Sequence, residues 1–181
     1  MRNQKPQQSK TFALLRERTC CVLAILSLLF LSGCTGNVAY NKYEGIPTRG
    51  WLRADTMKFE AEIRDSATYE SFIAMRIDNS FPYVGLSVIV EQSILHGKDK
   101  PKILRDTVDC ELIDKHGNIK GSGLSRFQYE FPVTDIALSP DDKVTTKIYH
   151  IMNKDTIPSV TEVGYVLRKV SNLPLAPPNE G

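Results

Sequence analysis

The stretch Met57-Lys58-Phe59-Glu60-Ala61-Glu62-Ile63-Arg64 alternates strictly between apolar and charged side chains. Because successive side chains of a β-strand point to opposite faces, this alternation predicts a strand with one face on an apolar core and the other in water. A helix would instead gather its apolar residues at intervals of three and four. Half-buried strands are therefore expected to decide the fold.

The same period of two returns along the rest of the chain, at residues 69–78, 83–93, 103–114, 121–131, 143–152 and 162–170. Segments with turn chemistry separate these runs, such as Asn79-Ser80-Phe81-Pro82 and Ser139-Pro140-Asp141-Asp142. The pattern predicts an all-β fold, an antiparallel β-sandwich of seven to eight strands that is either immunoglobulin-like or of jelly-roll type. A single helical turn is the expectation at residues 136–138.

The first 33 residues predict an export signal instead of a part of the fold. Five Lys and Arg residues precede an apolar run at residues 21–31, which is the order of a signal peptide. The run is shorter than the ~20 residues that a transmembrane helix needs. The segment Leu31-Ser32-Gly33-Cys34 follows and resembles the lipobox of bacterial lipoproteins.

The lipobox resemblance implies cleavage before Cys34, attachment of a diacylglycerol to its thiol and acylation of the freed amino group with a fatty acid such as palmitate. Two or three acyl chains hold a protein durably on a bilayer, whereas one chain binds reversibly. The expected organisation is then a signal peptide at 1–33, the lipidated cysteine with a flexible tether at 34–50, a β-sandwich at 51–170 and a disordered tail at 171–181.

Removal of the leader changes the charge and the cysteine count. It leaves 18 basic and 20 acidic residues, so the formal net charge falls from +2 to −2. The remaining charges form no basic stripe, which argues against binding to nucleic acid. Beyond Cys34 the mature chain keeps only Cys110, so its domain has to be stable without an internal disulfide.

The sequence holds no spacing that is typical of catalysis or of metal binding. His96, His116 and His150 lie in no metal-binding motif and are expected to be solvated or to cap turns, and Cys110 is expected to be a small buried side chain. We therefore expect no catalytic residue, no metal site, no cofactor and no enzymatic activity.

Two features are candidates for a partner or ligand surface. The charged run Arg76-Ile77-Asp78-Asn79 ends a predicted strand, where it either contacts a partner or forms an ion pair and a turn. Flat aromatic rings can cover the apolar face of a sugar, or they can simply pack in the core. The aromatic candidates are Trp51, Phe81, Tyr83, Tyr129 and Tyr149.

Several marks occur together in an order that resembles the gliding motility lipoproteins called GldH, a family of the Bacteroidetes. The resemblance runs from about Tyr40 to Lys169, and it departs from the family pattern at Ile119, where an aromatic residue is expected. The marks are Trp51, the run 76–79 followed by Tyr83 and Leu86, Arg105-Asp106-Thr107, Asp114 with Gly117, Gly121-Ser122-Gly123, His150-Ile151-Met152 and Val160-Thr161-Glu162-Val163-Gly164.

The resemblance implies a non-enzymatic accessory of an envelope complex that serves gliding motility or type IX secretion, with other envelope proteins as partners. No acidic residue follows Cys34 closely, so we expect the periplasmic face of the outer membrane, because surface lipoproteins of this phylum tend to carry such acids. A glycan-binding lipoprotein with a sandwich like that of carbohydrate-binding modules is the alternative.

Substitution of the lipobox cysteine tests the anchor. Metabolic labelling with a clickable fatty acid should mark the wild-type protein and leave Cys34→Ala unlabelled, because the acceptor thiol is gone. Equal labelling of the two proteins, or release of the wild type into the soluble periplasm, would refute the lipid anchor.

Overall fold

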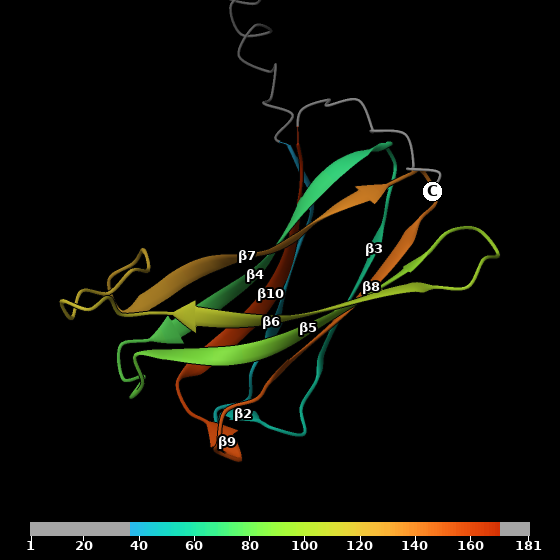
Figure 1. Cartoon of the computed structure of the whole chain (residues 1–181). Helices are drawn as coiled ribbons and strands as arrows, with labels where there is room; N and C mark the ends of the chain where they lie inside the picture. Colours follow the sequence, from blue (N-terminus) through green and yellow to red (C-terminus); the bar gives the residue numbers. More distant parts are fainter. Residues whose placement is uncertain (1–36, 171–181) are drawn as a thin grey trace, which may run out of the picture. The chain divides into compact units, whose positions relative to one another are not determined.

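A computed structural model describes residues 37–170, and these form a sandwich of two antiparallel sheets (Figure 1). One sheet has the strand order β1-β10-β4-β7, the other has the order β3-β8-β5-β6, and a short pair, β2-β9, lies outside both. The bounds are β1 Val38–Gly45, β2 Trp51–Leu52, β3 Met57–Glu62, β4 Ala67–Asp78, β5 Gly85–Leu95, β6 Lys102–Glu111, β7 Arg126–Leu138, β8 Lys143–His150, β9 Thr156–Ile157 and β10 Val160–Lys169.

The strand order decides between the two predicted sandwich types. When the eight strands of the large sheets are numbered one to eight along the chain, the sheets read 1-8-3-6 and 2-7-4-5. This order is the double Greek key of a jelly roll. The predicted all-β sandwich is therefore confirmed, with eight strands in the sandwich and two more in the β2-β9 pair.

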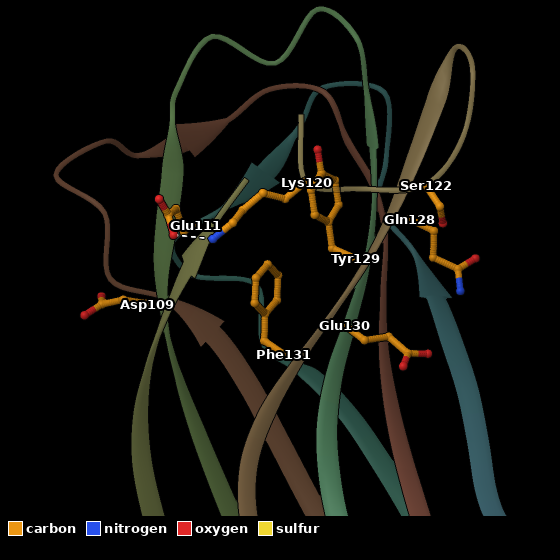
Figure 2. Close-up of a pocket in the computed structure, with 8 residues that line it drawn as sticks. All are labelled: Asp109, Glu111, Lys120, Ser122, Gln128, Tyr129, Glu130 and Phe131. Atoms are coloured by element: carbon orange, nitrogen blue, oxygen red, sulfur yellow. Dashed lines mark hydrogen bonds and ion pairs between the residues drawn. The ribbon is translucent and has the colours of Figure 1, made fainter. Parts of the chain in front are cut away.

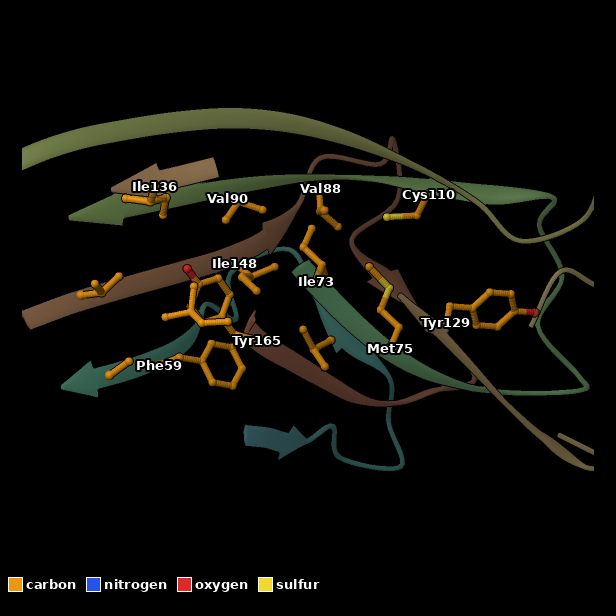
Figure 3. Packing of buried hydrophobic residues seen from close by; sticks show 14 of the residues in the cluster. Phe59, Ile73, Met75, Val88, Val90, Cys110, Tyr129, Ile136, Ile148 and Tyr165 are labelled. Carbon is orange, nitrogen blue, oxygen red and sulfur yellow. The ribbon is translucent and has the colours of Figure 1, made fainter. Parts of the chain in front are cut away.

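The alternation of the sequence explains how the two sheets bury a common core. In β3, Phe59 and Ala61 face inward while Lys58, Glu60 and Glu62 face water. The inward residues of the opposite sheet meet them, and the ring centroids of Phe59 and Tyr165 lie 6.2 Å apart (Figure 3). Among the described residues Cys110 is the single free cysteine, so no disulfide joins the two sheets there. Apolar burial between the sheets is thus the main stabilising contribution.

A small polar cluster lies inside this apolar core. The amide Nε2 of Gln92 donates to the hydroxyl of Tyr165 at 2.9 Å, and both residues are fully buried. The hydroxyl of Ser71 donates to the carbonyl of Thr134 at 2.6 Å, where the pairing of β4 and β7 shifts register. The Gln92–Tyr165 bond joins the two sheets, whereas the Ser71–Thr134 bond lies within one sheet. Leaving such a buried polar group unpaired would cost about 1–3 kcal/mol.

Two expectations about the strands are wrong. Residues 38–45, predicted as part of a flexible tether, form β1 and pair with β10. Residues 136–138, predicted as a helical turn, form the last part of β7, where Ile136 and Leu138 face the core. In both places backbone pairing with a neighbouring strand outweighs the local pattern.

Within residues 37–170 there is no helix long and apolar enough to cross a membrane. The predicted signal peptide, Cys34 and the tail at 171–181 lie outside the described residues.

Candidate functional site

The sequence left Trp51 open as a surface ring or as core packing, and the structure places it in the core. Its side chain is 0% exposed on β2, and its Nε1 donates to the carbonyl of Asp55 at 3.0 Å. Its ring meets His150 edge-on, with the centroids 5.3 Å apart. Burial lowers the pKa of His150, so the imidazole is held neutral beneath the indole and is not solvated as expected.

The predicted residues Arg76 and Asp78 do lie at the surface, on the outer face of the β1-β10-β4-β7 sheet. The guanidinium of Arg76 bonds Glu162 of β10 at 2.6 Å. Arg126 of β7 lies 3.5 Å from Asp78 and 4.0 Å from Glu162. The four charges therefore form one network across three neighbouring strands.

Tyr43 covers this network from the edge strand β1. The guanidinium of Arg76 lies 4.4 Å from the centre of the Tyr43 ring, a cation–π contact. The ring needs Gly164 beneath it, because a Cβ on that glycine would come within 2.8 Å of Tyr43. An aromatic ring thus packs directly on the backbone of β10.

A second group of the same kind lies further along the face. Arg168 pairs with Glu130 and lies 4.6 Å from the centre of the Phe72 ring. Arg76 and Arg168 thus each have an acid and a ring as partners, whereas Arg126 has two acids. The charged groups on the outer face therefore have partners within the same face. Such half-exposed ion pairs typically contribute about 0–1 kcal/mol each to the stability of the fold.

Asn79 and Tyr83 lie apart from the charged network, in the β4-β5 connection. The N–H of Asn79 donates to the carbonyl of Ser125 at 3.3 Å, which ties this connection to the β6-β7 loop. Tyr83 is half-buried and meets Phe81 edge-on at 5.4 Å. The five predicted surface residues thus separate into one buried residue, two residues of a charged network and two residues of a loop.

A groove of about 680 Å³ opens between β6, the β6-β7 loop and β7 (Figure 2). Figure 2 shows Tyr129 and Phe131 at its floor and the Glu111–Lys120 ion pair across it, while Asp109 and Glu130 point away. The lining residues are Asp109, Glu111, Lys120, Ser122, Gln128, Tyr129, Glu130 and Phe131.

The aromatic floor of the groove depends on a glycine. The rings of Tyr129 and Phe131 are nearly parallel, at 8°, with centroids 6.1 Å apart. A Cβ on Gly121 would come within 2.6 Å of the Tyr129 ring, so the loop crosses this ring only because residue 121 has no side chain. The loop itself is closed by bridges between Ile113 and Ile119 and between Ser122 and Gln128.

Two observations bear on reactive and metal-binding side chains among the described residues. Cys110 is 1% exposed, and burial raises the pKa of its thiol to about 12, so the reactive thiolate does not form near neutral pH. No group of three His, Cys, Asp or Glu residues in the described ranges could hold a metal ion.

The fold and the surface define a small jelly-roll domain that presents a charged sheet face and an edge groove. Its family is shown by a match of residues 38–167 to the GldH lipoprotein model. The chain belongs to the GldH lipoprotein family and is thus a lipid-anchored protein of the cell envelope.

One relative in sequence agrees with the family, and two solved structures were also matched. A protein of Christiangramia forsetii described as a gliding motility lipoprotein GldH homolog is 24% identical over 161 residues, which cover 82% of this chain and 94% of the relative. A crystal structure from Sulfurospirillum deleyianum matches 74% of this chain and 99% of its own, with 11% identity and a TM-score of 0.42. The Eiger TNF structure from S. frugiperda matches 67% of this chain and 70% of its own, with 8% identity and a TM-score of 0.33.

Truncation of the buried tryptophan separates a packing role from a binding role. Trp51→Ala should lower the free energy of unfolding by about 3–5 kcal/mol, because the fully buried indole leaves a cavity. Denaturant unfolding of the mature chain carrying Cys34→Ala measures this, with the half-buried Tyr83→Ala as the control that should lose less. A loss for Trp51→Ala below about 1 kcal/mol would contradict a packing role.

Proposed function

We propose that this lipoprotein is a non-enzymatic scaffold of an envelope complex that serves gliding motility or type IX secretion. Lipidated Cys34 anchors it, and the end of the sandwich far from the anchor holds other envelope proteins. Membership of the GldH family supports the setting. The observation that carries the binding role is that the two most exposed apolar residues, Leu124 and Val84, lie at one end of the sandwich.

The antiparallel pairings define the two ends. Val38 at the start of β1 pairs with Arg168, Lys169 pairs with Tyr69, and Ala67 pairs with Leu138. The start of β1 therefore lies at the end where β10 and β7 finish. The β4-β5 and β6-β7 connections lie at the other end, which we call the distal end.

The distal end exposes large apolar side chains. Leu124 is 96% exposed and Val84 is 70% exposed, with Ile119 nearby in the β6-β7 loop. The two loops are tied together, because the carbonyl of Val84 accepts hydrogen bonds from the N–H groups of Leu112 and Ile113. Apolar side chains grouped in exposed loops are typical of a protein contact.

The distance to the anchor supports this division of roles. Val38 lies four residues after Cys34, and four extended residues span at most about 14 Å. Lipid on Cys34 would therefore keep the start of β1 close to the membrane. The distal end would then face away from it, toward other proteins.

The glycan-binding alternative has less support from the geometry. Trp51 is fully buried and Tyr129 is 7% exposed, so neither offers a flat face to a sugar. The hydroxyl of Tyr149 already accepts a hydrogen bond from Arg105 at 2.9 Å. Phe81, Tyr83 and Tyr149 are the half-exposed aromatic candidates, and Phe81 and Tyr83 contact each other edge-on.

Crosslinking of the anchored protein in its own cells tests the scaffold. Mild crosslinking and purification should recover motility or secretion proteins with the wild type, and the yield should fall at least about tenfold for Leu124→Asp combined with Val84→Asp, because charge opposes apolar docking. Val38→Asp at the opposite end is the matched control and should keep the wild-type yield. Recovery of no envelope protein, or equal yields from both variants, would refute the proposal.

We also propose that the domain faces the periplasm from the outer membrane, since no acidic residue lies among residues 35–40. Protease added to intact cells should leave the mature domain whole, and permeabilised cells should show its digestion. Digestion on intact cells would place it on the cell surface instead.

A further inference from the structure

We infer that the free edge of β6 is a binding site for an extended polypeptide strand of a partner protein, whose side chains enter the groove beside it. This inference rests on the proposed scaffold function and adds the surface and the chemistry of the partner. Strand addition of this kind gains affinity from main-chain hydrogen bonds and specificity from alternate side chains.

The backbone of β6 has unused hydrogen-bonding groups along one side, because β6 is the last strand of its sheet. In an antiparallel pair the bonded positions alternate. The carbonyl of Val84 accepts from the N–H of Leu112, and the carbonyl of Ser87 accepts from the N–H of Ile151. Even-numbered residues of β5 therefore bond β6, and odd-numbered ones bond β8.

The same alternation gives the positions that are free on β6. Its even-numbered residues, such as Val108 and Cys110, pair with even-numbered residues of β5. The N–H and C=O groups of Arg105, Thr107 and Asp109 therefore point away from β5, toward the open edge. All three residues are exposed, so a further strand can reach the edge.

The neighbouring edge at β7 is closed to such pairing by its own sequence. The backbone of Gln128 exchanges hydrogen bonds with Ser122, at 2.9 and 3.1 Å. By the same alternation Pro132 lies at an edge-facing position and has no N–H to offer. Loop and proline are ordinary protections of an edge strand, and β6 lacks both over residues 103–111.

The groove supplies the room that side chains of an added strand need. Its volume of about 680 Å³ lies between the β6 and β7 edges, with Tyr129 and Phe131 as its floor. On the opposite side of the sandwich Tyr40 of β1 fills the corresponding space, with its ring 6.1 Å from that of Tyr165. An added strand would therefore complete the sandwich on its open side with apolar side chains.

The charges along the edge define the chemistry of the occupant. Asp109 and Glu111 lie at the groove end of β6, and Arg105 lies four residues before Asp109. Their present partners are Ser87, Lys120 and Tyr149, respectively, which an added strand would replace or share. Cross-strand neighbours of opposite charge are favourable. An antiparallel strand that fits has Lys or Arg opposite Asp109 and Glu111, an acid opposite Arg105, and apolar residues at the positions that point into the groove.

A synthetic peptide tests the site directly. The probe is Lys-Leu-Lys-Leu-Thr-Ser-Glu-Thr-Val, which places its two lysines opposite Glu111 and Asp109 and its glutamate opposite Arg105. It is titrated into the full mature chain carrying Cys34→Ala, and hydrogen exchange reports each backbone amide. Protection should appear at Thr107 and Asp109, and the peptide with Lys and Glu interchanged should bind at least about tenfold more weakly.

Two matched variants remove or retain one edge amide. Thr107→Pro should weaken the lysine peptide at least about tenfold, because proline has no N–H, while Thr107→Val keeps that N–H and should bind like the wild type. Denaturant unfolding of each variant checks that it is folded. If Thr107→Pro does not fold, Asp109→Lys replaces it and should likewise weaken binding of the lysine peptide.

Three results would overturn the inference: equal binding by Thr107→Pro and Thr107→Val, equal binding of both peptides, or protection at another edge. A dimer of the wild type that Thr107→Pro dissociates would also overturn it, because the occupant would then be a second copy. The scaffold proposal fails separately, when crosslinking in cells recovers no envelope protein although the peptide binds β6.

Discussion

The position of β10 is the constraint on which the rest of the structure depends. This last strand lies between β1 and β4 and pairs with both. Without it, β1 has no partner in its sheet and the inward side chains of Val163, Tyr165 and Leu167 leave the core. The sheet therefore closes only when the last and nearly the first described segments of the chain meet. Contacts between residues so distant in sequence generally make folding slow.

The burial of β10 on both faces also explains where rings and charges are found. Gly164 and Val166 face outward in the alternation and are buried all the same, because β10 is central and Tyr43 covers Gly164. The charged network of Arg76 and the ion pair of Arg168 lie on either side of these two buried residues. Because the side chains around this central strand already contact one another, the outer face has few unpaired groups. The edge of β6, with its unpaired backbone groups, is therefore more accessible to a partner.

The period of two was enough to predict seven of the eight sandwich strands, because each alternates against a core. It missed β1, since Val-Ala-Tyr-Asn-Lys-Tyr-Glu-Gly carries little apolar alternation and pairs at an edge. It could not predict whether Trp51 is buried, because the sequence pattern does not distinguish a buried aromatic side chain from an exposed one. The groove was also beyond prediction, since Glu111, Lys120 and Phe131 meet only after the two sheets pack.

The closeness of β1 to the proposed lipid attachment has a mechanical consequence. A pull on the start of β1 from a membrane, opposed by a partner held at the distal end, acts along the strand direction. The hydrogen bonds between β1 and β10 are then loaded together in shear, whereas a pull across the strands would open them one at a time. With the proposed anchor at one end and the proposed partner at the other, the β1-β10 pairing would resist unravelling of the domain from β1.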